Sequence, residues 1–289
     1  MSDAFDEADA IAFLAGHGFA GPFRVKMLRG GYWNKVMRID SATGRHVLKR
    51  YVEVLPNSLF PNLPDQEAAA LDRLRSADVA PEPVGFWPEE GILVYGYVEG
   101  NLWSDDVVAV ADLLIRKEAV SSAGFRTVPW QPEAILAEGD RLMARCSDDP
   151  LARLLRKRRP EPQPVDPPAK FSMIHTDIGA GNLIGTGAGL RLIDWQCPAE
   201  GDLAEDVYSF LSPAFQLLNE RQPLTPDVVD TFFTALALSG MRDRYLRLRR
   251  YFAYRMAAYC CLRYQSAGED RALHDRYHAA VTAELEALV

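Results

Sequence analysis

Two aspartates and an asparagine follow two short apolar runs in the stretch 171–198, FSMIHTDIGAGNLIGTGAGLRLIDWQCP. Asp177 and Asn182 come after the first run, FSMI, and Asp194 comes directly after the second, LRLI. Burying a carboxylate is costly unless a partner neutralises it. A carboxylate and an amide oxygen at strand ends suit Mg²⁺, a hard ion that takes oxygen ligands and keeps several waters. We therefore predict that Asn182 and Asp194 hold a magnesium ion that carries a phosphate.

Asp177 has a separate predicted role in the same stretch. A carboxylate that lies near a metal ion, but is not bound to it, can accept or orient the proton of an attacking hydroxyl. The catalytic-loop aspartate performs this task in phosphoryl transfer. The glycines of GAG (179–181) allow the loop to bend sharply. His175 belongs to the same predicted catalytic loop, and we expect its imidazole to lock the loop through hydrogen bonds.

A phosphate also needs a cradle and a cation, and the first 70 residues supply candidates for both. Gly30 and Gly31 lie between two predicted strands in LRGGYWNKV, where backbone N–H groups can approach phosphate oxygens, and Asn34 follows them. Lys49 lies in the next strand, HVLKRYV, and Glu67 on the following helix can pair with it and aim it at the phosphates. Taken singly, these residues suit a hairpin turn, an exposed strand and a helix dipole. Their order along the chain favours phosphate binding.

Composition and charge narrow the class of protein. The chain has 289 residues, 48% of them hydrophobic and 25% charged, which is ample for a core in one large domain or two lobes. The net charge of −8 argues against a nucleic acid partner, because binding to a phosphate backbone usually needs a basic face. No apolar run is long enough to span a bilayer, so no membrane partner is expected.

Location and cysteine usage follow from short segments. The acidic N-terminal sequence MSDAFDEADAIAF lacks the basic region of a signal peptide, so we expect a cytoplasmic protein. Four cysteines show no CxxC spacing, so we predict reduced structural thiols. The basic run RLLRKRRP (153–160) is interpreted as the solvated C-terminal end of a helix, where cations suit the dipole and Pro160 stops the chain. No segment indicates a protein partner.

The elements that must position these residues follow from hydrophobic periodicity and turn signals. Residues 5–18 show helical spacing, and from residue 23 the pattern changes to strands with a turn at 41–44. A helix over 65–76 is predicted to begin with Asp65 as its N-cap. Two further strands, PVGFWP and GILVYGYVEG, complete a small β-rich region.

Beyond Gly100 the pattern is mostly helical. The segment 156–170 carries five prolines and is predicted to be a loop. Amphipathic or apolar helices are predicted over 104–120, 132–146, 203–218, 227–240, 242–264 and 270–288. The layout therefore indicates an α+β protein of two lobes, with a small β-rich N-lobe, a larger mainly helical C-lobe and a junction near 97–101.

These motifs resemble those of the aminoglycoside phosphotransferase/choline kinase family, which has a protein-kinase-like fold. HTDIGAGN matches the family's H-x-D-x4-N, and LIDW is the counterpart of the kinase D-F-G. RGGYWNKVMRI, VLKRY, QEAAALDRL, APEPVGF, ILVYGYVEG and GDLAEDVYSF support the match in the family's order, over roughly residues 24–215. Protein kinases keep H-R-D and D-F-G, so Thr176 and Trp195 point to the small-molecule branch.

The resemblance implies a two-lobed protein-kinase-like fold, with an N-lobe over 1–98 for nucleotide phosphates and a C-lobe over 99–289 for catalysis, metal and acceptor. It implies that Lys49 contacts the phosphates of ATP and that Glu67 steadies it. Backbone groups of Gly96 and Val98, after the strand ILVYG, are expected to bind adenine.

For the C-lobe the resemblance implies that Asp177 is the catalytic base or orienter and that Asn182 and Asp194 hold Mg²⁺. It also implies that Asp206, in GDLAEDVY, braces the catalytic loop, although on sequence alone a carboxylate at a helix N-terminus is an equally good interpretation.

The predicted function is an ATP- and Mg²⁺-dependent transfer of the γ-phosphate to a hydroxyl of a small molecule. One alternative is a choline/ethanolamine-type kinase, and another is a catalytically silent nucleotide-binding pseudokinase, against which the presence of all four key residues argues. A protein kinase is disfavoured, since only about a dozen residues separate Asp194 from Asp206 and no APE-like segment occurs.

The identity of the acceptor is less constrained by sequence. The acidic net charge is compatible with a cationic acceptor. Carboxylates that follow DWQCPA could line its cleft or could simply cap the next helix, namely Glu200, Asp202 and Glu205. Aromatic residues could cage an amine or could belong to the core, namely Trp195, Tyr208 and Tyr251.

Overall fold

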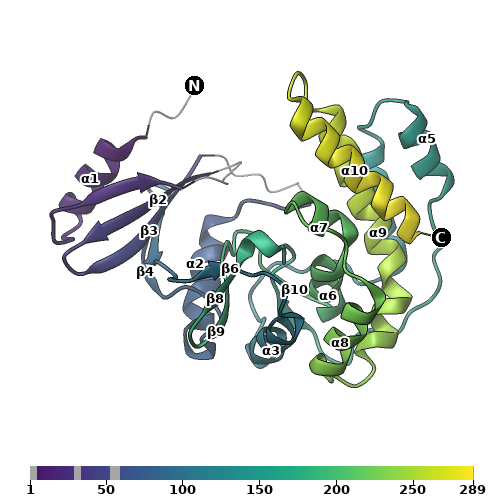
Figure 1. The fold of residues 1–289 in the computed structure, drawn as a ribbon, viewed down its shortest axis with the longest axis horizontal. Coiled ribbons are helices and arrows are strands. Elements are labelled where there is room, and N and C mark those ends of the chain that lie inside the picture. The colour runs from purple at the N-terminus through teal and green to yellow at the C-terminus, as the bar shows by residue number, and fades with distance from the viewer. Residues whose placement is uncertain (1–4, 29–33, 53–58, 289) are drawn as a thin grey trace. The chain divides into compact units, whose positions relative to one another are not determined.

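The computed structural model describes residues 5–28, 34–52 and 59–288 (Figure 1). The chain divides into two compact units. One is formed by Met1–Asn101 with Ile184–Pro198, and the other by Leu102–Leu183 with Ala199–Val289. The predicted phosphate turn at Gly30 and Gly31 lies outside the described residues.

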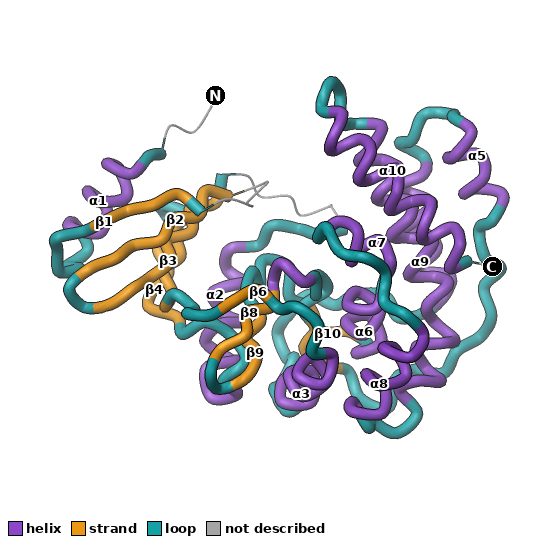
Figure 2. Tube along the Cα trace, viewed as in Figure 1, coloured by secondary structure: helices purple, strands orange, loops and turns teal. Residues whose placement is uncertain are grey.

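The N-terminal unit contains a five-stranded antiparallel sheet with strand order β1-β2-β3-β5-β4 (Figure 2). The strands are β1 (Arg24–Met27), β2 (Asn34–Ser41), β3 (Gly44–Tyr51), β4 (Pro83–Trp87) and β5 (Ile92–Gly96). The predicted turn at 41–44 joins β2 to β3, where Ser41 pairs with Gly44. Strand residues alternate between the two faces of the sheet, so neighbouring positions meet different surroundings.

One face of the sheet packs against α1 (Glu7–Gly16), a helix that Asp6 caps by accepting from the N–H groups of Ala8 and Asp9. This core buries apolar residues of α1, β2, β3 and β5, namely Ala10, Phe13, Leu14, Met37, Ile39, Leu48, Ile92 and Val94. Burial of this set is the main term that stabilises the sheet, at roughly 25 cal/mol per Å² of apolar surface.

The other face of the sheet carries Lys49, which is paired in register with Val36 on β2 and Leu93 on β5. The helix α2 (Pro64–Leu74) follows, then the short 3-10 helix η1 (Arg75–Ala77). Asp65 was predicted as the N-cap of α2, and this is wrong: the cap is Leu63, and Pro64 is the first helical residue. Proline suits that position because its fixed φ is already helical and its missing N–H would have no partner there.

Residues 184–198 return to the N-terminal unit as a hairpin. It consists of most of β8 (Leu183–Thr186) and of β9 (Gly189–Leu192), and the N–H of Leu192 donates to the carbonyl of Val79 at 2.8 Å. A Cβ at Gly100 would lie 2.1 Å from the carbonyl oxygen of Gly185, so only glycine fits there. The short strand β6 (Asn101–Leu102) comes next along the chain.

The C-terminal unit is mainly helical, and Figure 1 shows α10 running beside the long α9. Its helices are α3 (Val107–Glu118), α4 (Pro132–Met143), α5 (Pro150–Lys157), α6 (Leu203–Leu211), α7 (Pro213–Leu218), α8 (Pro226–Leu236), α9 (Met241–Gln265) and α10 (Arg271–Ala287). A two-stranded antiparallel ladder joins β7 (Ser172–Ile174) to β10 (Ala199–Gly201). The α+β fold class, with an antiparallel N-terminal sheet and a helical C-terminal region, is confirmed.

One predicted helix proved to be two. The helix expected over 203–218 is broken between α6 and α7, because Pro213 has no N–H to continue the helical ladder. Ser212 then caps α7 by accepting from the N–H of Phe215 at 3.2 Å.

Two smaller predictions are confirmed. The four cysteines are free and buried. The basic run 153–160 is the end of α5 and the residues after it, with its arginines engaged: Arg153 and Arg156 pair with Asp148, and Arg159 with Asp140. Across the described ranges, no helix is both long and apolar enough to cross a bilayer.

Candidate active site

Lys49 lies at the centre of a buried charge cluster in the N-terminal unit. Its side chain is 2% exposed, and its Nζ donates to Glu67 Oε2 at 2.6 Å and to Asp194 Oδ1 at 2.5 Å. Lys49 lies on β3 and Glu67 lies on α2. Asp194 is the second residue after the end of β9. The structure thus brings together three residues that the sequence analysis had placed in one nucleotide- and metal-binding site.

The electrostatics keep this lysine charged. Burial lowers the pKa of Lys49, but the carboxylates of Asp194 and Glu67 outweigh it, so the pKa is raised above its ordinary value. Burial raises the pKa of Glu67, and Lys49 counters part of that effect. Tyr51 also donates to Glu67 Oε2. Lys49 and Glu67 are sealed from solvent, whereas the Asp194 side chain is 37% exposed, so Asp194 is the open end of the cluster.

Asp194 and Thr176 share an uncommon backbone conformation. Their φ angles are +64° and +69°, in the left-handed region that a residue with a Cβ enters at a cost of about 1–2 kcal/mol. Such conformations persist only where the surrounding contacts impose them, and they concentrate at functional sites. Here they occur in the two segments from which the sequence analysis predicted the chemistry.

The other predicted nucleotide contacts have mixed surroundings. Asn34 is nearly buried and exchanges hydrogen bonds with Asn62, while its Nδ2 also reaches Gln196 Oε1 at 3.2 Å. Its side chain is therefore part of a buried amide network, and its contact with nucleotide stays a prediction. The N–H of Gly96 donates to the carbonyl of Glu82 at 2.7 Å, so this N–H is already used within the protein. Val98 follows β5 in the segment that leaves the sheet.

In the C-terminal unit, Asp206 of α6 forms hydrogen bonds with the backbone of the loop after β7. The carboxylate of Asp206 is fully buried and accepts from the N–H of His175 at 3.0 Å and from that of Thr176 at 2.8 Å. The predicted brace is therefore confirmed. Asp206 lies in the first turn of α6, but its carboxylate serves the loop.

Lys117, near the end of α3, completes this support and was missed by the sequence analysis. Its Nζ lies 3.0 Å from Asp206 Oδ2 and also donates to the carbonyl of Met173 on β7. Both Lys117 and Asp206 have fully buried side chains. On sequence alone Lys117 has the pattern of an ordinary lysine in the last turn of an amphipathic helix, where cations suit the dipole.

Ser209 and Asn219 hold the rest of the loop and were also missed. The Ser209 hydroxyl accepts from the N–H of Ile178 at 3.1 Å, and Asn219 Oδ1 accepts from the N–H of Gly181 at 2.7 Å. A Cβ at Gly179 or Gly181 would lie 2.6 Å from the Asn219 amide. A side chain at either position would therefore displace the Asn219 amide and disturb its hydrogen bond to the N–H of Gly181.

Inside the loop, His175 and Asn182 both support the residue between them. The N–H of Asp177 donates to His175 Nδ1 at 3.2 Å, which places the proton of a neutral ring on Nε2. Asn182 Nδ2 donates to the carbonyl of Asp177 at 3.0 Å. The loop-locking role expected for His175 fits this geometry.

The donor set fits a magnesium ion at Asn182 and at Asp194. The amide nitrogen of Asn182 is used inside the loop, which leaves its oxygen as a ligand, and Asp194 is partly exposed with one oxygen held by Lys49. Within the described residues, no three His, Cys, Asp or Glu side chains gather as a metal site made by protein alone would require. Mg²⁺ is instead commonly held by one or two protein oxygens with substrate phosphates. Asn182 and Asp194 belong to different units, so their joint site stays a prediction.

The acidic residues that could have lined a cleft for a cationic acceptor form hydrogen bonds or ion pairs within the protein. The structure therefore favours the alternative, a structural role. Asp202 caps α6 and pairs with Arg244, Glu205 is buried against Arg255, and Glu200 accepts from Ser122. The aromatic residues proposed for an amine cage belong to the core, namely Trp195, Tyr208 and Tyr251.

Comparison with known structures defines the class of protein. Choline kinase LicA from Streptococcus pneumoniae superimposes with a TM-score of 0.68 at 16% identity, covering 97% of this chain and 99% of that one. Spectinomycin phosphotransferase APH(9)-Ia, solved with ADP and spectinomycin, gives 0.65 at 12% identity, covering 99% and 98%. At these identities the likeness shows the fold alone, which is that of protein-kinase-like phosphotransferases.

The sequence places the chain within that class. Residues 24–251 match the sequence model described as Phosphotransferase enzyme family, and the chain belongs to this family. The predicted family resemblance is thereby confirmed. Thiamine kinase of Escherichia coli (strain K12) is 40% identical over 57 residues, which are 20% of this chain and 19% of that protein. The chain thus aligns with about a fifth of the length of the thiamine kinases it matches.

Proposed function

We propose that the chain is an ATP- and Mg²⁺-dependent kinase that transfers the γ-phosphate to a hydroxyl of a small molecule. The observation that carries this proposal is the Lys49 amine held between Glu67 and Asp194, with only Asp194 open to solvent. Membership of the Phosphotransferase enzyme family and the braced H-x-D-x4-N loop support it. A cytoplasmic location belongs to the same proposal, because ATP is the expected donor.

In the N-terminal unit we assign Lys49 to the phosphates of ATP. Two carboxylates hold its amine in place, so little reorganisation is needed when a phosphate approaches. Adenine recognition at Gly96 would use its carbonyl, since the N–H is taken, and Val98 would supply the other backbone group. Gly30 and Gly31 would cover the phosphates.

Asn182 and Asp194 would hold Mg²⁺ through their side-chain oxygens. Bound there, the ion would neutralise charge on the phosphate oxygens. The protein would hold these oxygens in position. The hydrogen bond from Asn182 to the Asp177 carbonyl orients the Asn182 side chain, and the bond from Lys49 together with the positive φ orients Asp194.

Asp177 would accept or orient the proton of the acceptor hydroxyl. The backbone on both sides of it is fixed by Asp206 and by Asn182, so the carboxylate is presented by a rigid loop. Pre-organisation of this kind lowers the entropic barrier of the transfer step.

Tyr259 of α9 lies close enough to Asp177 to feel its charge, and it neighbours Arg263 of α9 and Tyr277 of α10. Burial raises the pKa of Tyr259, and neighbouring Tyr277 and the charge of Asp177 add to that rise. Arg263 lies over the ring of Tyr277 at 5.5 Å. The aromatic face of Tyr277 is therefore already occupied by a cation of the protein itself, Arg263. We infer that the acceptor is recognised by hydrogen bonding and not as a quaternary amine in an aromatic cage.

The test is a phosphorylation screen of the purified chain with Mg²⁺ and ATP against amino-alcohols, sugars, amino acids, aminoglycosides and thiamine. We expect turnover with at least one class, and a loss of at least about 1,000-fold in kcat for Asp177→Asn with nucleotide binding retained. Asp112→Asn, an exposed carboxylate paired with Arg116, is the matched control and should leave turnover unchanged.

Three outcomes would count against parts of the proposal. Full turnover by Asp177→Asn would reject the base assignment. Nucleotide binding without turnover on any acceptor would favour the pseudokinase alternative. Turnover confined to choline or ethanolamine would overturn the inference drawn from Arg263 and restore the choline/ethanolamine-type kinase.

A further inference from the structure

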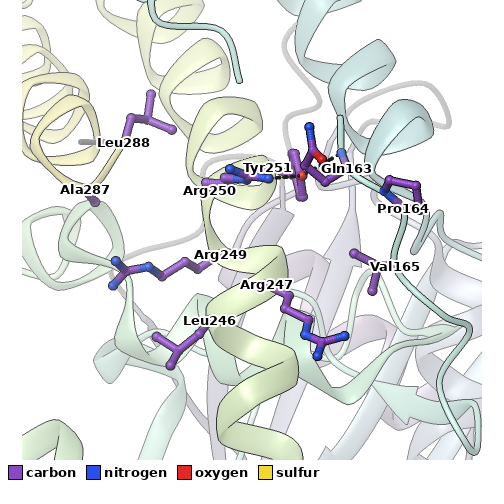
Figure 3. Close-up of a pocket in the computed structure, with 10 residues that line it drawn as sticks. All are labelled: Gln163, Pro164, Val165, Leu246, Arg247, Arg249, Arg250, Tyr251, Ala287 and Leu288. Carbon is purple, nitrogen blue, oxygen red and sulfur yellow. Dashed lines mark hydrogen bonds between the residues drawn. The ribbon is translucent and has the colours of Figure 1, made fainter. Parts of the chain in front are cut away.

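A groove on the C-terminal unit lies among residues that the proposed kinase function does not use (Figure 3). Its floor is the segment 246–251 of α9, one wall is the loop 163–165, and the other is the end of α10. The cavity measures about 480 Å³, within the size range of small-molecule sites, which is about 300–1,000 Å³. Its lining residues are Gln163, Pro164, Val165, Leu246, Arg247, Arg249, Arg250, Tyr251, Ala287 and Leu288.

Three arginines line this groove without a carboxylate. Arg247, Arg249 and Arg250 form no ion pair with any described residue, and none of the residues that line the groove is acidic. On the same helix, arginines before and after this run form ion pairs with carboxylates. Arg242 pairs with Asp230, Arg244 with Asp202, and Arg255 with Glu205.

The walls of the groove are fixed by hydrogen bonds. Tyr251 is fully buried, and its hydroxyl accepts from the N–H of Gln163 at 2.9 Å and from Arg250 Nη2 at 2.6 Å. Arg158 donates to the carbonyl of Leu285 at 3.0 Å, which ties the chain before the loop to α10. The Nε of Arg250 is buried without a hydrogen-bond partner among the described residues. An unpartnered buried donor is costly, so a ligand that reached it would be favoured.

The charge is spread across the groove. Figure 3 shows Arg249 directed toward the α10 side and Arg247 toward Val165, with Arg250 beside Tyr251 and Gln163. A single anionic group cannot meet all three guanidinium groups at once. A ligand with two or more anionic groups can contact more of them than a single anion can, and the planar guanidinium fork suits phosphate and carboxylate oxygens.

We propose that this groove binds a small polyanion of the class of diphosphates and phosphorylated metabolites. The chain as a whole carries a charge of −8 and repels anions, so three arginines in one groove that pair with no carboxylate of the described residues are a local exception to its field. The groove is separate from the predicted catalytic loop in sequence, and the proposal does not depend on the kinase activity.

The experiment is titration calorimetry of the full chain with pyrophosphate in the absence of Mg²⁺. The groove variant is R247Q/R249Q/R250Q. The matched control, R141Q/R242Q/R276Q, removes the same charge from paired surface arginines outside the groove. We expect one pyrophosphate per chain, at least tenfold weaker affinity in the groove variant, and affinity within twofold of the parent in the control.

Further arms separate the ligand classes and guard against misfolding. Pyrophosphate should bind more tightly than inorganic phosphate; tighter binding of citrate would instead assign the groove to polycarboxylates and overturn the phosphate class. If the triple variant fails to fold, it is replaced by R247Q/R249Q. This double variant changes only the two exposed arginines. Equal weakening in groove and control variants would mean general charge screening. Unchanged affinity in the groove variant would place pyrophosphate at another site, and either result would overturn the proposal.

Discussion

Two buried lysines organise the two units, and they differ in what they leave open. Lys49 in the N-terminal unit meets one sealed carboxylate, Glu67, and one that is 37% exposed, Asp194. Lys117 in the C-terminal unit meets Asp206, and both side chains are fully buried. The first arrangement presents a carboxylate outward, whereas the second is closed and acts on the loop through backbone N–H groups.

The difference separates a residue that can touch a ligand from one that positions others. The role proposed for Lys49, contact with a phosphate, would use the side of the cluster at Asp194, because that carboxylate is the exposed one. Lys117 has no such side, and its contribution is to give the buried Asp206 carboxylate a cationic partner. We therefore expect Lys117 to govern stability and Lys49 to govern nucleotide binding.

The largest expected effect on stability is that of Lys117→Met. It leaves Asp206 buried without its cation, and removing one partner of a buried pair commonly costs about 3–5 kcal/mol. Urea denaturation should show a loss of that order in the free energy of unfolding. A loss below about 1 kcal/mol would mean that the backbone N–H groups alone satisfy Asp206, and the comparison between the two lysines would fail.

Glu284 is a buried carboxylate that forms no ion pair with a described lysine or arginine. It therefore extends the comparison of the two lysines to a buried charge without a cation. Burial raises its pKa to about 7, although the Ser212 hydroxyl and the Ala214 N–H lower it in part. Because this value lies above the ordinary 4.5, the stability it contributes is complete below about pH 4.5 and is lost as the pH rises toward 7.

The corresponding prediction is that Glu284→Gln removes this pH dependence. The shift corresponds to about 3 kcal/mol between the two ends of the window. Unfolding free energies of the parent and the variant, measured by urea denaturation from pH 4.5 to 8, should therefore converge or cross as the pH rises. Parallel curves would show that Glu284 titrates normally in the folded chain.

A smaller loss of stability, about 2 kcal/mol, is expected for Lys49→Met. Glu67 can then take up a proton and keep its bond to Tyr51, and Asp194 remains partly hydrated. Titration calorimetry should show a larger loss of affinity for ATP than for adenosine. Equal losses for both ligands would mean that Lys49 does not contact the phosphates.

The smallest effect is expected at an exposed lysine. Lys170 pairs with Glu118 at 3.3 Å with its side chain 58% exposed, and such pairs contribute about 0–1 kcal/mol. Lys170→Met should therefore change the unfolding free energy by less than about 1 kcal/mol. A loss as large as that of Lys117→Met would show that burial is not what separates these lysines.

Sequence reasoning reached the residues to which we assign the chemistry. The H-x-D-x4-N loop and the order of Lys49, Glu67 and Asp194 were sufficient to predict the fold class and the Lys49 cluster. Periodicity located most helices, but the break at Pro213 and the first residue of α2 depended on local proline geometry that was not weighed.

The supporting residues could not be found in the same way. Lys117 has the pattern of an exposed helix-end lysine, and only the packing of α3 against β7 buries it. Asn219 ends a short helix after a proline, and nothing in its neighbours indicates that it meets Gly181 some 38 positions earlier. The three groove arginines belong to a long basic helix, and only the structure shows which of its arginines meet no carboxylate among the described residues.

The hairpin at 184–198 makes the N-terminal unit discontinuous in sequence. A protease that cuts once in the segment 97–101 cannot release that unit whole, since Asp194 would stay on the longer fragment and Lys49 would keep only Glu67. Exchange of N-lobes between relatives by recombination would likewise need crossovers on both sides of the hairpin. Pairing between Lys49 and Asp194 therefore couples two distant stretches of the gene, which must be inherited together for the cluster to survive.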